Sequence, residues 1–303
     1  MMQWRVIILS SLFSIVFYEV SKLSLSRSYR FSECKCPPKP VKVFPPDGAT
    51  ACSICESHGP LVRNGSVYSF LQVGNLKHGK WPIPANLKVV MEIGANNRNT
   101  LDQEYLPSHT DSFLLTFEPL LDKYAALVAR LSSTQIDKHV PLGFHHQRGI
   151  IMPWAISGTR GSARFNLAPV DGCSSLLEPN SDQKWAPWCK GVPEIRSVPT
   201  IPLEEVLRML PDGIDVEYLK IDAQGMDVMV VESAGSEASR IRRVTIETVT
   251  DREDCGLLYL GQPRCSDAVN RLQRIGFMLE GSNPCKSAGN CEFDLHFSRL
   301  KMV

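Results

Sequence analysis

From about residue 86, short apolar runs alternate with segments whose apolar residues recur every three to four positions. Residues 87–93 (LKVVMEI) and 112–118 (SFLLTFE) are continuous apolar runs, which are typical of strands buried on both faces. Residues 120–131 have the spacing of an amphipathic helix. The same two patterns predict further strands at 149–156, 163–167, 216–222 and 242–248, and further helices at 202–210, 226–234 and 266–275.

Strands that alternate with helices over short turns predict an α/β fold, namely a Rossmann-like, doubly wound sheet of seven mostly parallel strands. The last two apolar runs, 276–281 and 291–300, are joined by turn residues and predict a C-terminal antiparallel hairpin. The main domain therefore spans residues 86–303. It follows an apolar leader at 1–25 and a Pro- and Cys-rich stalk or strap at 26–85.

Residues 168–197 interrupt the alternation and are expected to form an insertion. They include Trp185 and Trp188, whose aromatic faces suit a sugar ring but more often pin such a segment to the core. A bridge between Cys173 and Cys189 would close the same segment into a loop.

The N-terminal run from Val6 to Tyr18 is apolar on every side and is therefore expected to meet a membrane rather than the protein core. It is shorter than the roughly 17–25 residues of a spanning helix, although extension to Leu25 reaches about that length. Because no small-residue cleavage site precedes the basic residues that follow, an uncleaved signal-anchor is favoured over a cleaved signal peptide. Those basic residues, however, argue for a cytoplasmic rather than a lumenal body.

The ten cysteines favour the opposite orientation, because their number is even and all of them follow the apolar run. Turn-rich segments suggest the short bridges Cys255–Cys265 and Cys285–Cys291, and a glycosylation sequon at Asn64 fits the same compartment. We therefore expect a Golgi- or ER-lumen-facing single-pass protein, or a secreted one. A zinc site is a second interpretation of the remaining N-terminal cysteines, which are Cys34, Cys36, Cys52 and Cys55.

Charge is almost balanced along the chain, with 33 Lys and Arg residues against 32 Asp and Glu residues. Such a balance creates no overall field that would attract a polyanion. No nucleic-acid partner is therefore expected.

The first strand of the main domain ends in Glu92 and is followed at once by Gly94, Ala95 and Asn96. In an open parallel sheet, this first strand-to-helix turn is where a ligand binds. A glycine lets backbone approach the ligand, the amides that follow can donate to it, and Glu92 can accept from an ammonium group. The next strand ends in Glu118, 26 positions later, where an acid can accept both hydroxyls of a ribose.

The same turn disfavours a pyrophosphate ligand. A dinucleotide fingerprint needs three glycines, but Asn96 and Asn99 stand at the second and third of those positions, and no phosphate-binding lysine follows. A nucleoside without phosphates fits better, and S-adenosylmethionine is a common one whose ammonium and carboxylate suit Glu92 and the turn amides. The alternative interpretation is a plain tight turn beside a surface glutamate.

Six segments resemble, in order and at fitting intervals, the FkbM-type S-adenosylmethionine-dependent methyltransferases. They are VVMEIGANNRNT, LLTFEPLLDKYAAL, WAISGTRGSARFNL, VPTIPLEEVL, VEYLKIDAQGMDVMVVESA and RRVTIETV, and together they cover roughly residues 86–250. The resemblance implies a class I methyltransferase fold with S-adenosylmethionine as cofactor. By the same resemblance, the cofactor seat consists of Glu92, Gly94, Ala95, Asn96, Glu118 and Ala155.

Glu92 replaces the family's usual aspartate, and two further departures matter more. Arg98 stands where the family has glycine, and Gln224 replaces the glutamate of the L-K-I-D-x-E-G block, in which Lys220 and Asp222 match. Both departures leave room for a descendant that kept the fold but lost transfer.

The resemblance implies transfer of a methyl group to an oxygen, which needs a positioned acceptor and a group that takes its proton. Asp222 is the first candidate for base or substrate orienter, with capping of the following helix as the alternative. Lys220 alternates with Asp222 and is expected to keep it ionised, and Glu247 at the end of the next strand is the second candidate base. His145 and His146 are expected at the surface rather than in catalysis, and no trio of metal ligands stands out, so the reaction is predicted to be metal-independent.

Three functions from different classes follow. The first is an S-adenosylmethionine-dependent O-methyltransferase acting on a hydroxyl of a glycan or another small hydroxylated substrate. The second is a catalytically inactive binding or structural protein with the methyltransferase fold, motivated by Arg98 and Gln224. The third is a type II membrane glycosyltransferase, which the leader suggests but which lacks a convincing D-x-D acid pair.

Overall fold

The computed structural model describes residues 61–63, 66–68, 79–81, 83–96, 100–129, 149–170, 172–286 and 289–299. The apolar leader, the four N-terminal cysteines, the Asn64 sequon, Arg98 and the His145–His146 pair lie outside these residues. Within the expected stalk, β1 (Leu61–Arg63) and β2 (Ser66–Tyr68) pair antiparallel. No helix of the described ranges has the length and apolar content needed to cross a membrane.

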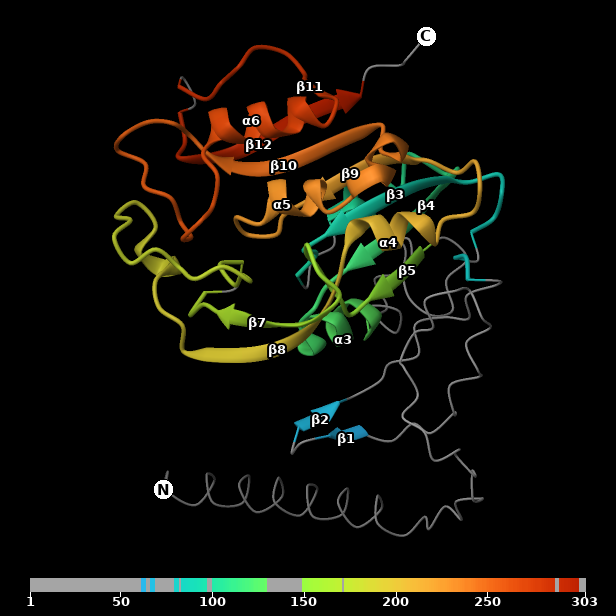
Figure 1. Ribbon diagram of the computed structural model, residues 1–303, viewed down its shortest axis with the longest axis horizontal. Coiled ribbons are helices and arrows are strands. Elements are labelled where there is room, and N and C mark those ends of the chain that lie inside the picture. The colour runs from blue at the N-terminus through green and yellow to red at the C-terminus, as the bar shows by residue number, and fades with distance from the viewer. Residues whose placement is uncertain are drawn as a thin grey trace, which may run out of the picture. The chain divides into compact units, whose positions relative to one another are not determined.

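A seven-stranded sheet forms the centre of the fold and confirms the predicted α/β class (Figure 1). Its spatial order is β11-β12-β10-β9-β3-β4-β5, and the strands are β3 (Lys88–Ile93), β4 (Ser112–Phe117), β5 (Gly149–Met152), β9 (Val216–Ile221), β10 (Arg243–Val249), β11 (Phe277–Leu279) and β12 (Glu292–Arg299). The pairs on either side of β3 are parallel, and β12 runs antiparallel to both β10 and β11. The chain order reverses beside β3, which makes this strand's carboxyl end the place where a ligand settles.

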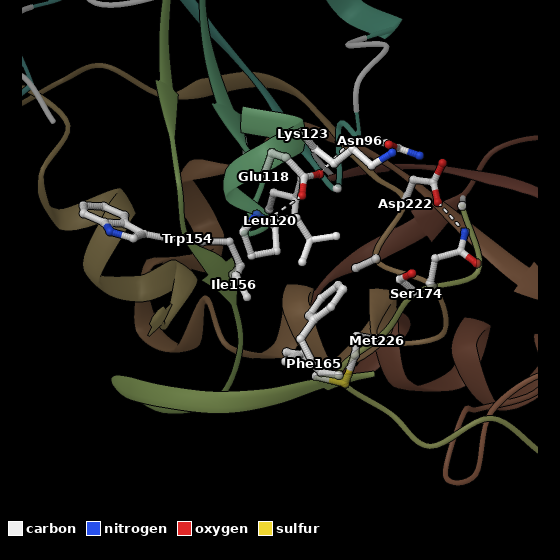
Figure 2. A pocket seen from close by; sticks show the side chains of 18 residues that line it. Asn96, Glu118, Leu120, Lys123, Trp154, Ile156, Phe165, Ser174, Asp222 and Met226 are labelled. Atoms are coloured by element: carbon white, nitrogen blue, oxygen red, sulfur yellow. Dashed lines mark hydrogen bonds between the residues drawn. The ribbon is translucent and has the colours of Figure 1, made fainter. Parts of the chain in front are cut away.

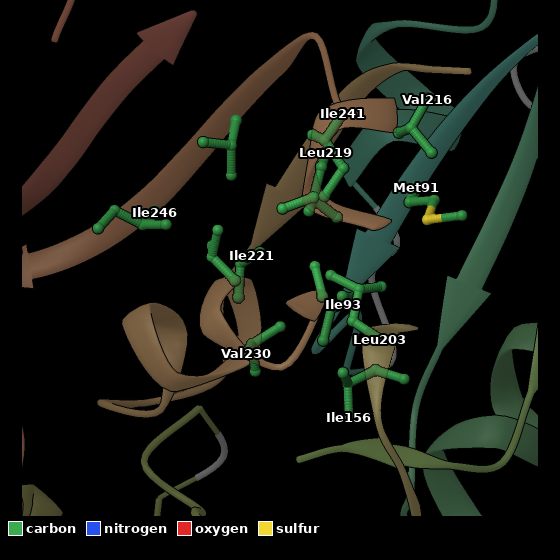
Figure 3. Packing of buried hydrophobic residues seen from close by; sticks show 14 of the residues in the cluster. Met91, Ile93, Ile156, Leu203, Val216, Leu219, Ile221, Val230, Ile241 and Ile246 are labelled. Carbon is green, nitrogen blue, oxygen red and sulfur yellow. The ribbon is translucent and has the colours of Figure 1, made fainter. Parts of the chain in front are cut away.

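Apolar clusters cover the sheet on both faces. Successive side chains of β3 point to opposite sides and so contribute to both clusters. Met91 and Ile93 join the larger apolar cluster, which Figure 3 shows between the sheet and the elements that carry Leu203 and Val230. Val90 points into a second cluster. The larger cluster is completed by α4 (Leu203–Arg208), α5 (Asp227–Glu232), the short 3-10 helix η4 (Gly235–Arg240) and α6 (Cys265–Arg274); the second involves α2 (Thr100–Glu104) and α3 (Leu121–Ala129).

A second, three-stranded sheet was not predicted. It has the order β6-β8-β7 and consists of β6 (Ala155–Ile156), β7 (Gly161–Leu167) and β8 (Glu194–Ile201). The single apolar run at 149–156 is divided at Pro153 between β5 of the central sheet and β6 of this one. The expected insertion at 168–197 ends inside β8, whose first residues are exposed and which contains Pro199, so it lacks the apolar run of a buried strand.

Three disulfides cross-link the described residues, and they correct part of the expected pairing. Cys173–Cys189 is confirmed, with its 3-10 helix η3 (Pro187–Cys189) carrying the second cysteine. The short bridges suggested within 255–265 and 285–291 are wrong, because the four cysteines pair as Cys255–Cys291 and Cys265–Cys285. Cys265 opens α6 and packs in the main core together with Cys285, so tertiary packing rather than loop length selects the partner.

Candidate active site

A cavity opens at the carboxyl ends of β3, β4, β5 and β9, where the reversal of strand order places a ligand. It encloses about 740 Å³ of empty space, the part open to solvent included. Five predicted residues line it, namely Gly94, Asn96, Glu118, Ala155 and Asp222. Figure 2 shows Asn96, Glu118 and Asp222 around one side of this cavity.

Glu118 follows β4 and ties the first turn to the second strand. Its Oε2 accepts the Asn96 backbone N–H at 2.7 Å, and its Oε1 accepts that of Leu120 at 2.9 Å (Figure 2). The side chain is 4% exposed, and this burial raises the pKa of Glu118 to about 7 despite the two N–H donors. Each carboxylate oxygen keeps a second lone pair, so Glu118 can still accept from a ligand.

Gly94 is required by the fold itself. Its φ is +82°, and a Cβ there would stand 1.9 Å from the carbonyl oxygen of Asp222. The ends of β3 and β9 are in contact at this point, where Asp222 N–H donates to the Ile93 carbonyl at 2.9 Å. The predicted close approach at Gly94 is therefore backbone against backbone, and it brings Asp222 to the edge of the cavity.

Glu92 and Ala95 lie outside the cavity lining. The Glu92 side chain is 1% exposed, and its Oε2 accepts the backbone N–H of Leu101 at 2.9 Å, at the start of α2. Ala95 is buried in the second apolar cluster. Glu92 thus holds the loop that carries Asn96, and its predicted contact with a ligand ammonium stays a prediction.

Lys220 on β9 and Asp222, which follows the strand, lie on the same side, as the alternation of the strand predicts. Lys220 Nζ is 3.8 Å from Asp222 Oδ2. Burial lowers the pKa of Lys220, but the surrounding carboxylates, Asp222 and Glu92 foremost, outweigh burial and raise it. Lys220 is therefore a fixed positive charge beside Asp222. Capping of the next helix does not explain Asp222, because α5 begins only at Asp227.

Glu247 on β10 lies one strand away from Asp222 and is joined to it by Gln224. The Gln224 side-chain amide donates to Asp222 Oδ1 at 2.7 Å and to Glu247 Oε2 at 3.2 Å. Burial, and then the charge of Asp222, raise the pKa of Glu247 to about 9. Glu247 therefore carries a proton at neutral pH and is poorly suited to accept another.

The opposite wall of the cavity is apolar and was not predicted as part of the site. Figure 2 shows Trp154, Ile156, Phe165 and Met226 there, and Leu176 also lines it. Phe165 and Leu176 come from β7 and the segment after it, so the unpredicted second sheet builds this wall. Such surfaces suit the flat face of a nucleobase.

The two tryptophans of the 168–197 segment lie outside the cavity lining. Trp185 Nε1 donates to the Gly256 carbonyl at 2.6 Å, so this side chain pins the segment to a neighbouring loop. Trp188 is 54% exposed. Across the described ranges, no three His, Cys, Asp or Glu side chains are arranged so that they could hold a metal ion.

Comparison with known proteins assigns the family. The profile described as "Methyltransferase FkbM domain" matches residues 90–274, which is more than half of the chain. The search of curated proteins gave no match.

Solved structures with a similar arrangement include a putative tRNA (m1A22) methyltransferase, Sp1610, from Streptococcus pneumoniae, with 10% identity, 72% of this chain and 66% of that chain covered, and a TM-score of 0.36. Magnesium protoporphyrin IX methyltransferase (ChlM) from Synechocystis PCC 6803 with bound SAM has 9% identity, 71% of each chain covered and a TM-score of 0.35. The aminoglycoside resistance methyltransferase NpmB1 has 8% identity, 73% and 95% covered, and a TM-score of 0.38. With the sheet order, the cavity at its carboxyl edge and the matched profile in agreement, this chain belongs to the FkbM methyltransferase family.

Proposed function

We propose that the protein transfers a methyl group from S-adenosylmethionine to a hydroxyl group of a glycan or another small hydroxylated acceptor. The observation that carries the proposal is the cavity at the carboxyl ends of β3, β4 and β9, which combines Glu118 and Asp222 with an apolar wall. The FkbM profile also supports the proposal, as does the combination of a polar and an apolar wall in one cavity.

The lining residues fit a phosphate-free adenosine ligand. Glu118 offers the lone pairs that its two backbone bonds leave for ribose hydroxyls, and Trp154, Ile156 and Phe165 offer an apolar surface for adenine. Among the described residues that line the cavity, Lys123 is the one that carries a positive charge. It can attract the ligand's carboxylate.

S-adenosylmethionine, when bound, supplies a methyl group made electrophilic by a positively charged sulfur. The protein has to align the acceptor and handle its proton. Asp222 lines the cavity and is half-exposed, so it can orient an acceptor hydroxyl and take its proton. Lys220 Nζ, 3.8 Å from Asp222 Oδ2, places a positive charge beside this carboxylate. Because Glu247 already holds a proton, we favour Asp222 over Glu247 as the base.

The compartment is part of the proposal. Three disulfides within the described residues support an oxidising environment, such as the ER or Golgi lumen or the cell exterior. Anchoring to a membrane by the apolar leader and the lack of a nucleic-acid partner remain predictions from the sequence.

The first test is calorimetric titration of the purified chain with S-adenosylmethionine, S-adenosylhomocysteine and nucleotide sugars. Binding of the first two supports a methyltransferase, whereas binding of a nucleotide sugar alone supports the glycosyltransferase alternative. Transfer of labelled methyl to a panel of glycans and small hydroxylated compounds then separates an enzyme from an inactive binding protein.

The variant Asp222→Asn tests the assigned base. We expect kcat to fall by about 10²–10⁴-fold with little change in S-adenosylmethionine affinity, because acid–base catalysis contributes about that much. Asp267→Asn, at an exposed position of α6, is the matched control. Equal kcat for D222N and D267N would remove Asp222 from the mechanism.

A further inference from the structure

Gln224 occupies a backbone conformation that is unusual for a residue with a side chain. It follows Asp222 by two positions, and its φ is +50°, in the left-handed region that favours glycine. Such a conformation is energetically unfavourable for a residue with a side chain and persists where the surroundings determine it. At Gln224 the surroundings are a set of hydrogen bonds directed at both its backbone and its side chain.

The orientation of the Gln224 amide is fixed from both ends. The hydroxyl of Tyr259 donates to Gln224 Oε1 at 2.8 Å. On the other side, Gln224 Nε2 faces the carboxylate oxygens of Asp222 at 2.7 Å and Glu247 at 3.2 Å. An ionised carboxylate only accepts, so the amide nitrogen has to face Asp222 and the amide oxygen has to face the phenol.

Tyr259 is itself held rigidly. It is 1% exposed, and its hydroxyl also lies 2.9 Å from the Cys173 carbonyl, within the disulfide-closed segment that helps to line the cavity. Gly225 leaves room for its ring, since a Cβ there would stand 2.7 Å from Tyr259 Cδ2. Burial raises the pKa of Tyr259 far above its usual value, so the phenol remains a donor. The Ser175 hydroxyl completes the clamp by donating to the Gln224 carbonyl at 2.7 Å.

We infer that Gln224 is a positioning residue, whose amide, oriented by Tyr259, holds the Asp222 carboxylate against the cavity and joins it to Glu247. This inference rests on the proposed function, in which Asp222 orients the acceptor and takes its proton. With Oδ1 held by the amide and Oδ2 facing Lys220 at 3.8 Å, the carboxylate has a fixed direction before an acceptor arrives.

The departure from the family's glutamate at this position therefore has a physical explanation in this chain. An ionised glutamate in the same place would offer no donor to Asp222 and would bring a second negative charge to within contact distance of it, beside the protonated Glu247. The group around them already contains one cation and several acids, which are Lys220 on β9, Asp227 on α5, and Glu292 and Asp294 on β12. An amide at position 224 donates to the side-chain oxygens of both Asp222 and Glu247 without adding charge.

The test compares Gln224→Glu and Gln224→Met with Gln273→Glu, a matched change at an exposed position of α6. Methionine keeps the length of the side chain and removes the amide donor without adding a charge. The full chain is used, with labelled S-adenosylmethionine and the acceptor on which the wild-type protein shows the highest transfer. Three quantities are measured for each variant: cofactor affinity, kcat and acceptor KM across pH, and melting temperature across pH.

We expect both Gln224 variants to bind S-adenosylmethionine within about threefold of wild type, while kcat falls by about tenfold or more. Only Q224E should also shift the acid limb of its kcat–pH profile to higher pH, by about one pH unit, since it alone adds a carboxylate beside Asp222. The melting temperature of Q224E should fall further below wild type as pH rises, because the added carboxylate must then ionise. Q273E should follow wild type throughout.

Wild-type kcat and an unshifted profile in both Gln224 variants would overturn the inference while leaving the proposed function intact. Parallel melting curves for Q224E and Q273E across pH would also overturn it, and this readout needs no acceptor. Wild-type protein that binds no S-adenosylmethionine, or binds it without transfer to any acceptor, would instead defeat the proposed function, and the inference with it.

Discussion

Glu118 is the residue whose replacement most directly tests ligand binding. In Glu118→Gln the side chain keeps its shape but has one acceptor oxygen instead of two. The wild-type carboxylate accepts the N–H groups of Asn96 and Leu120, so one of these buried donors loses its partner in the variant. The same change removes the negative charge that the account assigns to ribose binding.

The expected effect on affinity follows from these contacts. A hydrogen bond to a charged group contributes about 1.5–3 kcal/mol, so E118Q should bind S-adenosylmethionine about 10–150-fold more weakly. The pKa of Glu118 is raised to about 7 by burial, and ribose hydroxyls donate to the ionised form. Wild-type affinity should therefore rise by about tenfold between pH 6 and pH 8, as the ionised fraction grows from roughly a tenth to nine-tenths.

Calorimetry at pH 6, 7 and 8 measures both effects. Glu104→Gln, at an exposed position of α2, serves as the matched control and should reproduce the wild-type curve. The ligand's own titration is common to all three proteins, so only the difference between variants is informative. If E118Q bound as tightly as E104Q, or with the same pH dependence, Glu118 would not contact the ribose.

Three further predictions concern stability. Gly94→Ala should lower the free energy of unfolding, measured by denaturant titration, by about 3 kcal/mol or more, since its Cβ would meet the Asp222 carbonyl at 1.9 Å. Gly213→Ala is the control. Gly213 has a similar φ of +76° but open space around it, so this change should lower the free energy of unfolding by only about 1 kcal/mol. Replacing Cys173 and Cys189 together by serine opens a loop of 16 residues and should cost about 3 kcal/mol, seen as a lower Tm under non-reducing conditions. The ligand-free protein should lose stability as pH rises from 5 to 9, because burial raises the pKa of four acids, which are Glu118, Asp227, Glu247 and Glu292, to between about 7 and about 9.

The sign of the pH effect follows from linkage. An acid whose folded-state pKa is above its unfolded value binds more protons when folded, so its contribution is complete below the unfolded value and is lost as pH rises through the folded one. Stability that stayed constant or increased from pH 5 to 9 would contradict these assignments. Equal losses in G94A and G213A would remove the backbone contact at Asp222 as the reason for glycine, and an unchanged Tm in the double serine variant would remove the bridge as a stabilising element.

β3 and β4 were predictable because each is an apolar run that is buried along almost its whole length. β9 contains Glu217 and Lys220 among its apolar residues, and its alternation correctly placed Lys220 and the following Asp222 on one side. β8 was missed because exposed polar residues occupy its first half and its role depends on pairing with β7, which is invisible in its own sequence.

Half of the site was predictable for a similar reason. The carboxyl ends of parallel strands meet at one edge, so Asn96, Glu118 and Asp222 could be placed together from sequence. The apolar wall could not, because Phe165 belongs to the second sheet. Tyr259 could not either, since its contact with Gln224 spans 35 positions from a loop whose apolar residues give no periodic signal.

Glu92 makes a backbone contact that the sequence did not predict. Its place at the end of β3 was predicted, but its carboxylate accepts the N–H of Leu101 inside the protein. From sequence, an acid at a strand end cannot be assigned to a ligand or to the backbone, because both offer N–H donors at the same distance.

A crystal structure of the chain with S-adenosylhomocysteine tests the central claim most directly. We expect the ribose hydroxyls within hydrogen-bond distance of Glu118, the adenine against Phe165 and Ile156, and the sulfur on the side of Asp222. A ligand bound elsewhere, or one in this cavity with its ribose away from Glu118, would contradict it.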